Sequence, residues 1–176
     1  RKLPAEDSEF VVLFAGVLGP SQGLDVIIDV AEHLQGRSRA RFIFVGDGTE
    51  KGRLLNRINE SGISNVSFMP FVSKENYPDL LSEAHAGMVC LSSNNKTPVV
   101  PSKIIGYMAA GLPVLAVLNR ESDGHEIIRG ASCGFSFYPE EKTGIANAIL
   151  ELEKDVAFRR RMGDRGREFA RLHFSI

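Results

Sequence analysis

The sequence predicts a doubly wound, Rossmann-like α/β domain built on a six-stranded parallel sheet, and three observations support this prediction. Six short and nearly continuous apolar runs recur along the chain, as expected for strands that are buried on both faces. Segments with helical spacing of apolar residues separate these runs, which favours right-handed strand–helix–strand crossovers. The 176 residues are 43% hydrophobic and 24% charged, which suits a single domain with a substantial core.

The residues that begin and end each segment define the first three strands and helices. Apolar runs predict strands at 10–15, 41–45 and 65–69, and helical spacing predicts helices at 21–34, 49–61 and 74–84. Ser21 and Thr49 are the expected caps of the first two helices, because a side-chain oxygen can accept from a free N–H group there. Gly62 ends the second helix, and Pro78 interrupts the third near its start.

The second half of the chain continues the same alternation. Its patterns predict strands at 87–91, 113–117 and 134–138, and helices at 102–110, 125–129, 141–154 and 156–173. Pro101 and Ser102 are typical of a helix start, and Gly111 is typical of a helix end. Pro113 opens the next strand, where a missing donor is tolerated. We expect residues 1–176 to form one domain.

The charge balance and the cysteines exclude several classes of function. The formal net charge of -1 gives no support for nucleic-acid binding. Cys90 and Cys133 both lie in apolar runs, which predicts two buried thiols rather than a disulfide or a metal pair. No histidine has metal-ligand spacing to another, so we expect no metal. The absence of a membrane span or signal peptide favours a cytoplasmic location.

The strand-to-helix loops are the places where a ligand would bind, because parallel sheets bind ligands beyond the carboxyl ends of their strands. In the first loop, Gly16, Gly19 and Gly23 let the backbone approach a ligand closely, and the helix that follows favours an anion. An ordinary glycine-rich turn explains the same residues equally well. The loop has neither the Gly-x-Gly-x-x-Gly spacing of nicotinamide dinucleotide sites nor the lysine of a P-loop.

The second and third loops offer mainly backbone groups. Gly46 and Gly48 form a tight turn that could line a nucleotide pocket, whereas Asp47 is expected to make turn hydrogen bonds. Backbone groups beside Phe71 and Val72 could bind the edge of a base. The ring of Phe71 itself is expected to pack in the core.

The fourth loop carries a cation where the helix dipole disfavours one. Lys103 follows Pro101 and Ser102 in the first turn of the expected helix. A bound phosphate would explain this placement, because it attracts both the ammonium and the helix N-terminus. A solvated lysine explains it at a cost of only tenths of a kcal/mol. The residues alone leave both explanations open.

Four segments together resemble the C-terminal, donor-binding domain of GT-B glycosyltransferases, the retaining family 4 enzymes in particular. They are Phe14–Gly16, Gly23–Asp25, Val45–Gly48 and Met108–Val114. Their order and spacing are similar to the family almost from end to end. The resemblance implies one half of a GT-B fold. The chain also begins with Arg1, so we expect an N-terminal acceptor domain in a longer protein.

The chain departs from the family pattern at the positions that usually carry charge. Val17 and Gln22 stand where the family has an arginine and a lysine that hold the donor diphosphate. Pro98 and Gly106 stand where it has two glutamates, the second of which binds the ribose. The segments 19–24, 101–103 and 107–111 are similar to one branch, which includes the N-acetylfucosamine transferases of bacterial O-antigen and capsule synthesis.

This resemblance implies a nucleotide-sugar donor, with UDP and an N-acetylated hexosamine as the expected chemistry and no other cofactor. It implies that Lys103 is the catalytic residue that stabilises the departing diphosphate. The implied donor-binding residues are Gly16, Gly19, Gln22, Gly23, Gly46, Asp47, Gly48, Phe71, Val72, Pro101, Ser102, Lys103 and Ile104. Glu121 is a candidate for ribose or sugar hydroxyls, with a solvated charged loop as the alternative.

The implied acceptor is a glycan or lipid-linked molecule in surface polysaccharide synthesis, bound through the missing domain. The mixed charges of the last helix point mainly to a solvated face, and peripheral contact with the inner face of the membrane stays open. Two other functions stay open as well. One is a non-hydrolysing UDP-sugar epimerase, and the other is a non-catalytic nucleotide-sugar-binding or scaffold domain.

Overall fold

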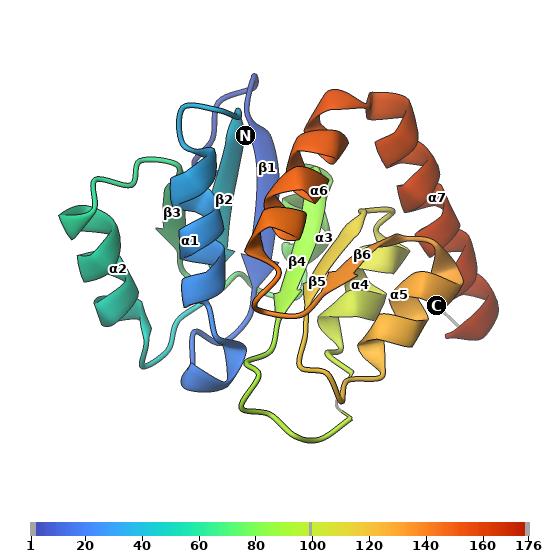
Figure 1. Cartoon of the computed structure of the whole chain (residues 1–176). Helices are drawn as coiled ribbons and strands as arrows, with labels where there is room; N and C mark the ends of the chain where they lie inside the picture. The colour runs from blue at the N-terminus through green and yellow to red at the C-terminus, as the bar shows by residue number, and fades with distance from the viewer. Residues whose placement is uncertain (1–2, 99, 175–176) are drawn as a thin grey trace.

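The computed structural model of this protein describes residues 3–98 and 100–174, and it contains one parallel sheet of six strands (Figure 1). The strand order is β3-β2-β1-β4-β5-β6, and every neighbouring pair is parallel. The strands are β1 (Phe10–Ala15), β2 (Ala40–Val45), β3 (Val66–Met69), β4 (Ala86–Cys90), β5 (Val114–Val117) and β6 (Gly134–Phe137). The predicted doubly wound fold is confirmed.

Helices cover both faces of this sheet. They are α1 (Asp25–Leu34), α2 (Lys51–Glu60), α3 (Tyr77–Ser82), α4 (Lys103–Ala109), α5 (Gly124–Ala131), α6 (Lys142–Lys154) and α7 (Val156–His173), with a short 3₁₀ turn η1 (Pro20–Gln22) after β1. Alternate residues of β1 enter two different apolar clusters, because successive side chains of a strand point to opposite faces. Phe10, Val12 and Phe14 pack with α1, α2 and α6. Val11 and Leu13 pack with α3, α4, α5 and the end of α7.

Two of the predicted helix caps are wrong. α1 begins at Asp25, after the 3₁₀ turn and Gly23, so Ser21 is one residue of that turn and caps no helix. α2 has Glu50 at its N-cap, without a capping side-chain hydrogen bond, so Thr49 does not cap it. α3 is shorter than predicted, because Pro78 in its first turn fixes where the helix can begin.

The two cysteines are buried and free, as predicted. Burial raises the pKa of the Cys133 thiol to about 11 and raises the pKa of Cys90 further above its ordinary range. Both thiols therefore act as small apolar side chains of the core.

Tyr107 of α4 lies flat against the backbone of β4. Its side chain is fully buried, and a Cβ atom at Gly87 would overlap its ring. Its hydroxyl accepts a hydrogen bond from Ala15 N–H at 3.3 Å and lies 3.1 Å from the carbonyl oxygen of Met88. Tyr107 thus joins α4 to the ends of β1 and β4, the two strands at the centre of the sheet.

A network of charged side chains connects α1, α2 and α6. Arg53 and Arg57 of α2 bind Asp25 at 2.7 and 2.9 Å, and Arg57 also binds Asp29. Lys142 of α6 reaches Asp29 at 2.6 Å. The hydrogen bond from Arg53 lowers the pKa of Asp25. Burial alone would raise the pKa of Asp29, but hydrogen bonds from Lys142 and Arg57 outweigh it and lower that pKa.

Gly87, which faces the Tyr107 ring, and Gly106, which faces open space, provide a matched test of this packing. Gly87→Ala should destabilise the protein by about 1–3 kcal/mol, because the added methyl group overlaps a buried ring. Gly106→Ala should stabilise it by about 0.5–1 kcal/mol, because no heavy atom lies within 4 Å of the new Cβ and alanine favours the helix. Urea denaturation measures both. Equal effects of the two substitutions would contradict the placement of Tyr107.

The charged network predicts a specific loss of stability in acid. A carboxylate whose folded pKa is lowered adds stability above its unfolded pKa of 3.8, and this contribution disappears as the pH falls through the folded value. Asp29→Asn should therefore reduce the free energy of unfolding at pH 7, and the difference from the unsubstituted protein should shrink below about pH 4. Denaturation at a series of pH values measures this. A difference that is constant down to about pH 2 would rule out the ionic role of Asp29.

Candidate functional site

The loops after β1 and β4 flank the point where the strand order reverses. From this point the chain winds outward in both directions, and open α/β sheets bind ligands in the crevice that this reversal leaves at the carboxyl edge. This edge lies at the bottom of Figure 1, where the long loop between β4 and α4 runs below the sheet. Strand topology alone therefore places a candidate site between these two loops.

Hydrogen bonds hold the two loops together. The carbonyl oxygen of Ser21 accepts from Ser92 N–H at 2.8 Å and from the side-chain amide of Asn95 at 2.9 Å. Gly23 has a φ of 62°, and a Cβ atom there would lie 3.1 Å from the Ser92 backbone. Glycine at this position therefore permits both the left-handed turn and the close approach of the β4–α4 loop.

The first two ligand loops also pair beyond the end of the sheet. Leu18 N–H donates to the Asp47 carbonyl at 2.9 Å, and Glu50 N–H donates to the Leu18 carbonyl at 2.9 Å. A Cβ atom on Gly46 would overlap the Gly16 carbonyl oxygen, and one on Gly48 would overlap the Leu18 backbone. These glycines are thus explained by the contact between loops, which leaves direct ligand contact to be tested.

Two polar side chains of these loops have local partners. Asp47 accepts from the N–H of Gly48 at 2.8 Å, so the predicted turn hydrogen bond is confirmed. Gln22 accepts from the N–H of Gly19 at 3.0 Å through its side-chain oxygen. The predicted role of Gln22 toward a diphosphate therefore depends on its amide nitrogen or on release of this bond.

Phe71 lies on the surface, so the prediction that its ring packs in the core is wrong. Its exposed fraction is 56%, and its ring edge would lie 3.3 Å from a Cβ atom on Gly46. Val17, on the neighbouring loop, is 57% exposed. Val72 is half-buried and packs against the core. The carboxyl ends of β1, β2 and β3 thus present an exposed apolar surface formed by Val17 and Phe71.

Lys103 is the first residue of α4, and its ammonium lies over an aromatic ring. The Nζ atom is 4.6 Å from the centroid of the Tyr77 ring. In the part of the chain that the structure describes, no carboxylate lies within ion-pair distance of Lys103. The positive charge at this point of the edge is therefore free to interact with an anion.

The residues beside Lys103 differ in what they can contact. Pro101 is half-buried and Ser102 is exposed at the start of α4. Ile104 is fully buried in the core, and its N–H donates to the Pro101 carbonyl at 3.2 Å. The Ile104 side chain therefore has a packing role, and its place among the donor-binding residues stays a prediction for its backbone alone.

The loop between β5 and α5 places buried polar atoms at the same edge. A carboxylate oxygen of Glu121 and the side-chain carbonyl oxygen of Asn119 are buried and have no hydrogen-bond partner among the described residues. Glu121 is half-buried between the exposed Arg120 and Asp123, so both a contact with sugar hydroxyls and a place in a charged loop stay predictions. His125 Nε2 donates to the Asn119 carbonyl at 3.0 Å, which explains His125 as a support of this loop.

The other aromatic–cation contact at this edge is already neutralised. Arg120 lies 4.0 Å from the ring centroid of Tyr138, which follows β6, and Arg120 also forms an ion pair with Glu140. Lys74 and Lys96 are both exposed on their loops. Lys103 thus differs from Arg120 in that its charge has no acidic partner in the described chain.

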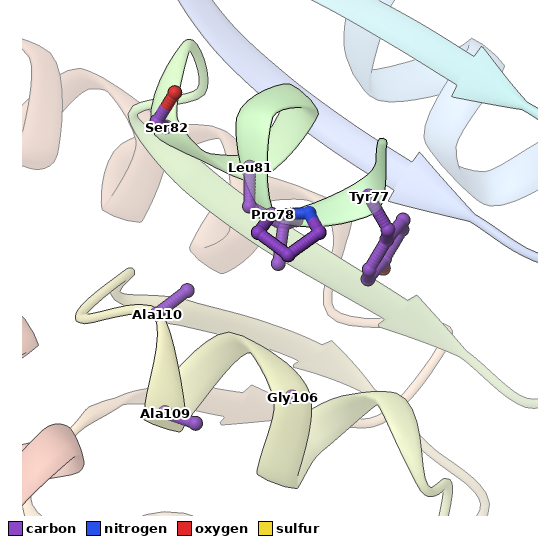
Figure 2. A pocket seen from close by; sticks show the side chains of 7 residues that line it. All are labelled: Tyr77, Pro78, Leu81, Ser82, Gly106, Ala109 and Ala110. Atoms are coloured by element: carbon purple, nitrogen blue, oxygen red, sulfur yellow. The ribbon is translucent and has the colours of Figure 1, made fainter. Parts of the chain in front are cut away.

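A groove of about 390 Å³ lies between α3 and α4 (Figure 2). Tyr77, one of its lining residues, is the residue whose ring lies under the Lys103 ammonium. Figure 2 shows Tyr77, Pro78 and Leu81 pointing toward the α4 segment that carries Gly106 and Ala109. Gly106 has no side chain and leaves this groove open.

The described residues hold neither a cluster of metal ligands nor a membrane-spanning helix. No group of three or more metal-ligating side chains occurs in residues 3–98 and 100–174. Among these same residues, no helix has both the length and the apolar composition needed to cross a membrane.

Sequence reasoning missed Tyr77, Asn95 and Asn119. Asn119 had a signal, since it is a polar residue directly after an apolar strand. Tyr77 and Asn95 had none, because their partners lie 26 and 74 positions away and only the folded chain brings them together.

Comparison with known proteins gives one family. The family described as "Glycosyl transferases group 1" matches residues 1–169. Among curated proteins, the chain is 30% identical over 111 residues to the putative colanic acid biosynthesis glycosyl transferase WcaI of Escherichia coli K12, a match that covers 63% of this chain and 27% of WcaI. The chain spans 27% to 40% of the length of the first curated relatives that it matches.

Two solved structures share the fold. A point mutant of S. aureus TarM, in complex with fondaparinux, α-GlcNAc-glycerol and UDP, superposes with a TM-score of 0.80 at 17% identity, over 99% of this chain and 35% of TarM. Anabaena Alr3699/HepE, in complex with UDP and glucose, superposes with a TM-score of 0.79 at 23% identity, over 94% of this chain and 44% of HepE. At these identities the two structures support the architecture of the domain.

Proposed function

This chain belongs to the group 1 glycosyl transferase family, and we propose that it is the donor-binding domain of a retaining enzyme that uses a nucleotide sugar. The donor is a UDP-linked sugar, with an N-acetylated hexosamine as the expected sugar, and the acceptor is a glycan or lipid-linked molecule of surface polysaccharide synthesis. The observation that carries the proposal is the unneutralised Lys103 ammonium beside the loops at the topological switch point.

The distribution of charge and apolar surface supports one orientation of the nucleotide. Val17 and Phe71 form an exposed apolar surface beyond β1, β2 and β3, which suits a base. Lys103 lies beyond β4, which suits the diphosphate. Asp47, the charged side chain of the β2 loop, would repel phosphates from the first half of the edge. We therefore place the base near Phe71 and the phosphates near Lys103.

The sugar would then lie beside the β5–α5 loop. Asn119 and Glu121 both have a buried oxygen without a hydrogen-bond donor among the described residues, and a buried acceptor without a donor is costly. Sugar hydroxyl groups are donors of the required kind. Glu121 is only half-buried and is our candidate for recognition of the donor sugar, in place of the glutamates that the sequence lacks at positions 98 and 106. Asn119 is fully buried and donates to the Thr97 carbonyl at 3.1 Å, so it supports the loop instead.

The chemical contribution of this domain is electrostatic. As the bond between sugar and diphosphate breaks, negative charge grows on the leaving oxygen, and a positioned cation stabilises that charge. Lys103 supplies this cation, and the loop backbone holds the nucleotide in place. A contact of equal strength in the bound donor and in the transition state would not accelerate the chemical step, so the Lys103 contact must strengthen as the charge develops. UDP in the solved structures of TarM and HepE supports the choice of nucleotide.

A second candidate function follows from the residues at positions 17 and 106. Val17 and Gly106 remove an arginine and a glutamate that the resembling enzymes use toward the donor. A non-catalytic nucleotide-sugar-binding domain would tolerate both losses. Release of UDP from a UDP-sugar by the protein distinguishes the candidates, because the enzyme releases UDP and the binding domain does not.

Replacement of Lys103 tests the phosphate contact. Lys103→Ala should weaken UDP binding by about tenfold or more, because charge-assisted hydrogen bonds contribute about 1.5–3 kcal/mol. Isothermal titration calorimetry with UDP measures the effect, and GDP and NAD serve as competing candidates. Lys154→Ala is the matched control, since this exposed lysine ends α6, away from the carboxyl edge. Unchanged affinity of Lys103→Ala, or a preference for NAD, would contradict the proposal.

Replacement of Phe71 tests the proposed orientation. Phe71→Ala should weaken UDP binding by about tenfold, because stacking of a base on an aromatic ring contributes about 1–3 kcal/mol. The affinity for inorganic pyrophosphate, which has no base, should not change. Leu172→Ala is the control, because Leu172 is 62% exposed on α7. Equal losses for UDP and pyrophosphate would show that Phe71 acts on the fold of the loops rather than on the base.

A further inference from the structure

We propose that Tyr77 is the positioning residue of Lys103, which it holds at the switch point through the face of its ring without cancelling the positive charge. This inference rests on the proposed function, and it adds a residue that neither the family match nor the sequence patterns identify. A face-on aromatic ring attracts an ammonium through its quadrupole. Because the ring carries no net charge, the ammonium remains available to the phosphates of the donor.

The backbone of α3 and the core beneath it hold the Tyr77 ring in place. Tyr77 is the first residue of α3, and Pro78 after it restricts the backbone there. The Tyr77 ring packs against the core cluster that contains Tyr107, and its buried hydroxyl has no hydrogen-bond partner among the described residues. Tyr107 is bound to the end of β1 through Ala15 N–H. Core packing, rather than a hydrogen bond of the hydroxyl, thus holds the ring under Lys103.

The surroundings of Lys103 leave the ring as its main anchor. The Nζ atom is 4.6 Å from the ring centroid, and no ion pair of Lys103 occurs in the described chain. Gly106 follows Lys103 by three positions on α4, where side chains of a helix face each other. A Cβ atom on Gly106 would have no heavy atom within 4 Å, so Gly106 contributes no contact to the lysine.

Arg120 is a cation of the same molecule that is held by both an aromatic ring and a carboxylate. It also lies over a tyrosine ring, that of Tyr138, but it forms an ion pair with Glu140 as well. A carboxylate orients a cation and neutralises it at the same time. The ring of Tyr77 orients Lys103 and reduces the side-chain freedom that is lost when a ligand binds, which improves affinity without lowering the charge.

A double-mutant cycle tests this coupling. The variants are Tyr77→Leu, Tyr77→Phe, Lys103→Ala and the pair Tyr77→Leu with Lys103→Ala, and the probes are UDP and inorganic pyrophosphate in calorimetric titrations. Tyr77→Leu should weaken both ligands by about threefold to fivefold, the effect of a lost cation–ring contact. Tyr77→Phe should bind as the unsubstituted protein does, because it keeps the ring. Tyr77→Leu should add no further loss to Lys103→Ala.

Tyr138→Leu is the matched control, because it removes a tyrosine–cation contact whose cation is already paired. It should leave both affinities unchanged. NMR of ¹³C-dimethylated lysines gives a readout that does not depend on the ligand. The Lys103 methyl signal should show a ring-current shift in the unsubstituted protein and in Tyr77→Phe, and this shift should be absent in Tyr77→Leu.

Each contrary outcome has a distinct meaning. Additive losses in the cycle, a loss in Tyr77→Phe equal to that in Tyr77→Leu, or an unshifted Lys103 signal would overturn the role of Tyr77 and leave the proposed function intact. If the unsubstituted protein binds neither UDP nor pyrophosphate, the proposed function fails and the role of Tyr77 fails with it.

Discussion

The contact between the ring of Tyr107 and the backbone of β4 at Gly87 determines where the candidate site lies. A side chain at Gly87 would lift α4 away from the sheet, and with it Lys103 and Gly106. The Tyr107 hydroxyl, which is bound to Ala15 N–H, connects the same helix to the end of β1. Burial raises the pKa of Tyr107 well above its ordinary value, so the hydroxyl keeps the proton that it donates to the Met88 carbonyl of β4. The position of α4 is thus set by a neutral, buried interaction rather than by the ligand.

The loops at the carboxyl edge are held by one another as well as by the sheet. The Ser21 carbonyl joins the loops after β1 and β4, and Leu18 and Asp47 join the loops after β1 and β2. Glycines occur where these backbones come closest, at Gly23, Gly46 and Gly48. A site built in this way is organised before a ligand arrives, which reduces the entropy that binding would otherwise cost.

The residues at positions 17 and 106, where the chain departs from the family pattern, both change the carboxyl edge of the sheet. Loss of an arginine at Val17 leaves an apolar surface next to Phe71, and loss of a glutamate at Gly106 leaves Lys103 without an acidic neighbour one turn away. Lys103 lies over an aromatic ring at this edge and has no acidic partner in the described chain. The half-buried Glu121 side chain offers a polar contact from the β5–α5 loop. In our proposal these replacements redistribute donor recognition among other residues of the same edge.

The sequence by itself determined the identity and order of the strands and helices, because each depends on apolar spacing and on glycine or proline within a few residues. The run at 10–15 and the helix end at Gly111, whose φ is 74°, are examples. The resemblance of four short segments further indicated the family and drew attention to Lys103. The tertiary structure alone decided that Phe71 is exposed, that Ile104 is buried, that Ser21 and Thr49 cap no helix, and that Tyr77 lies beneath Lys103. The physical reason is the separation of interacting residues along the sequence. Patterns within a few residues fix the backbone conformation, whereas exposure and side-chain partners depend on distant segments that only the folded sheet brings together.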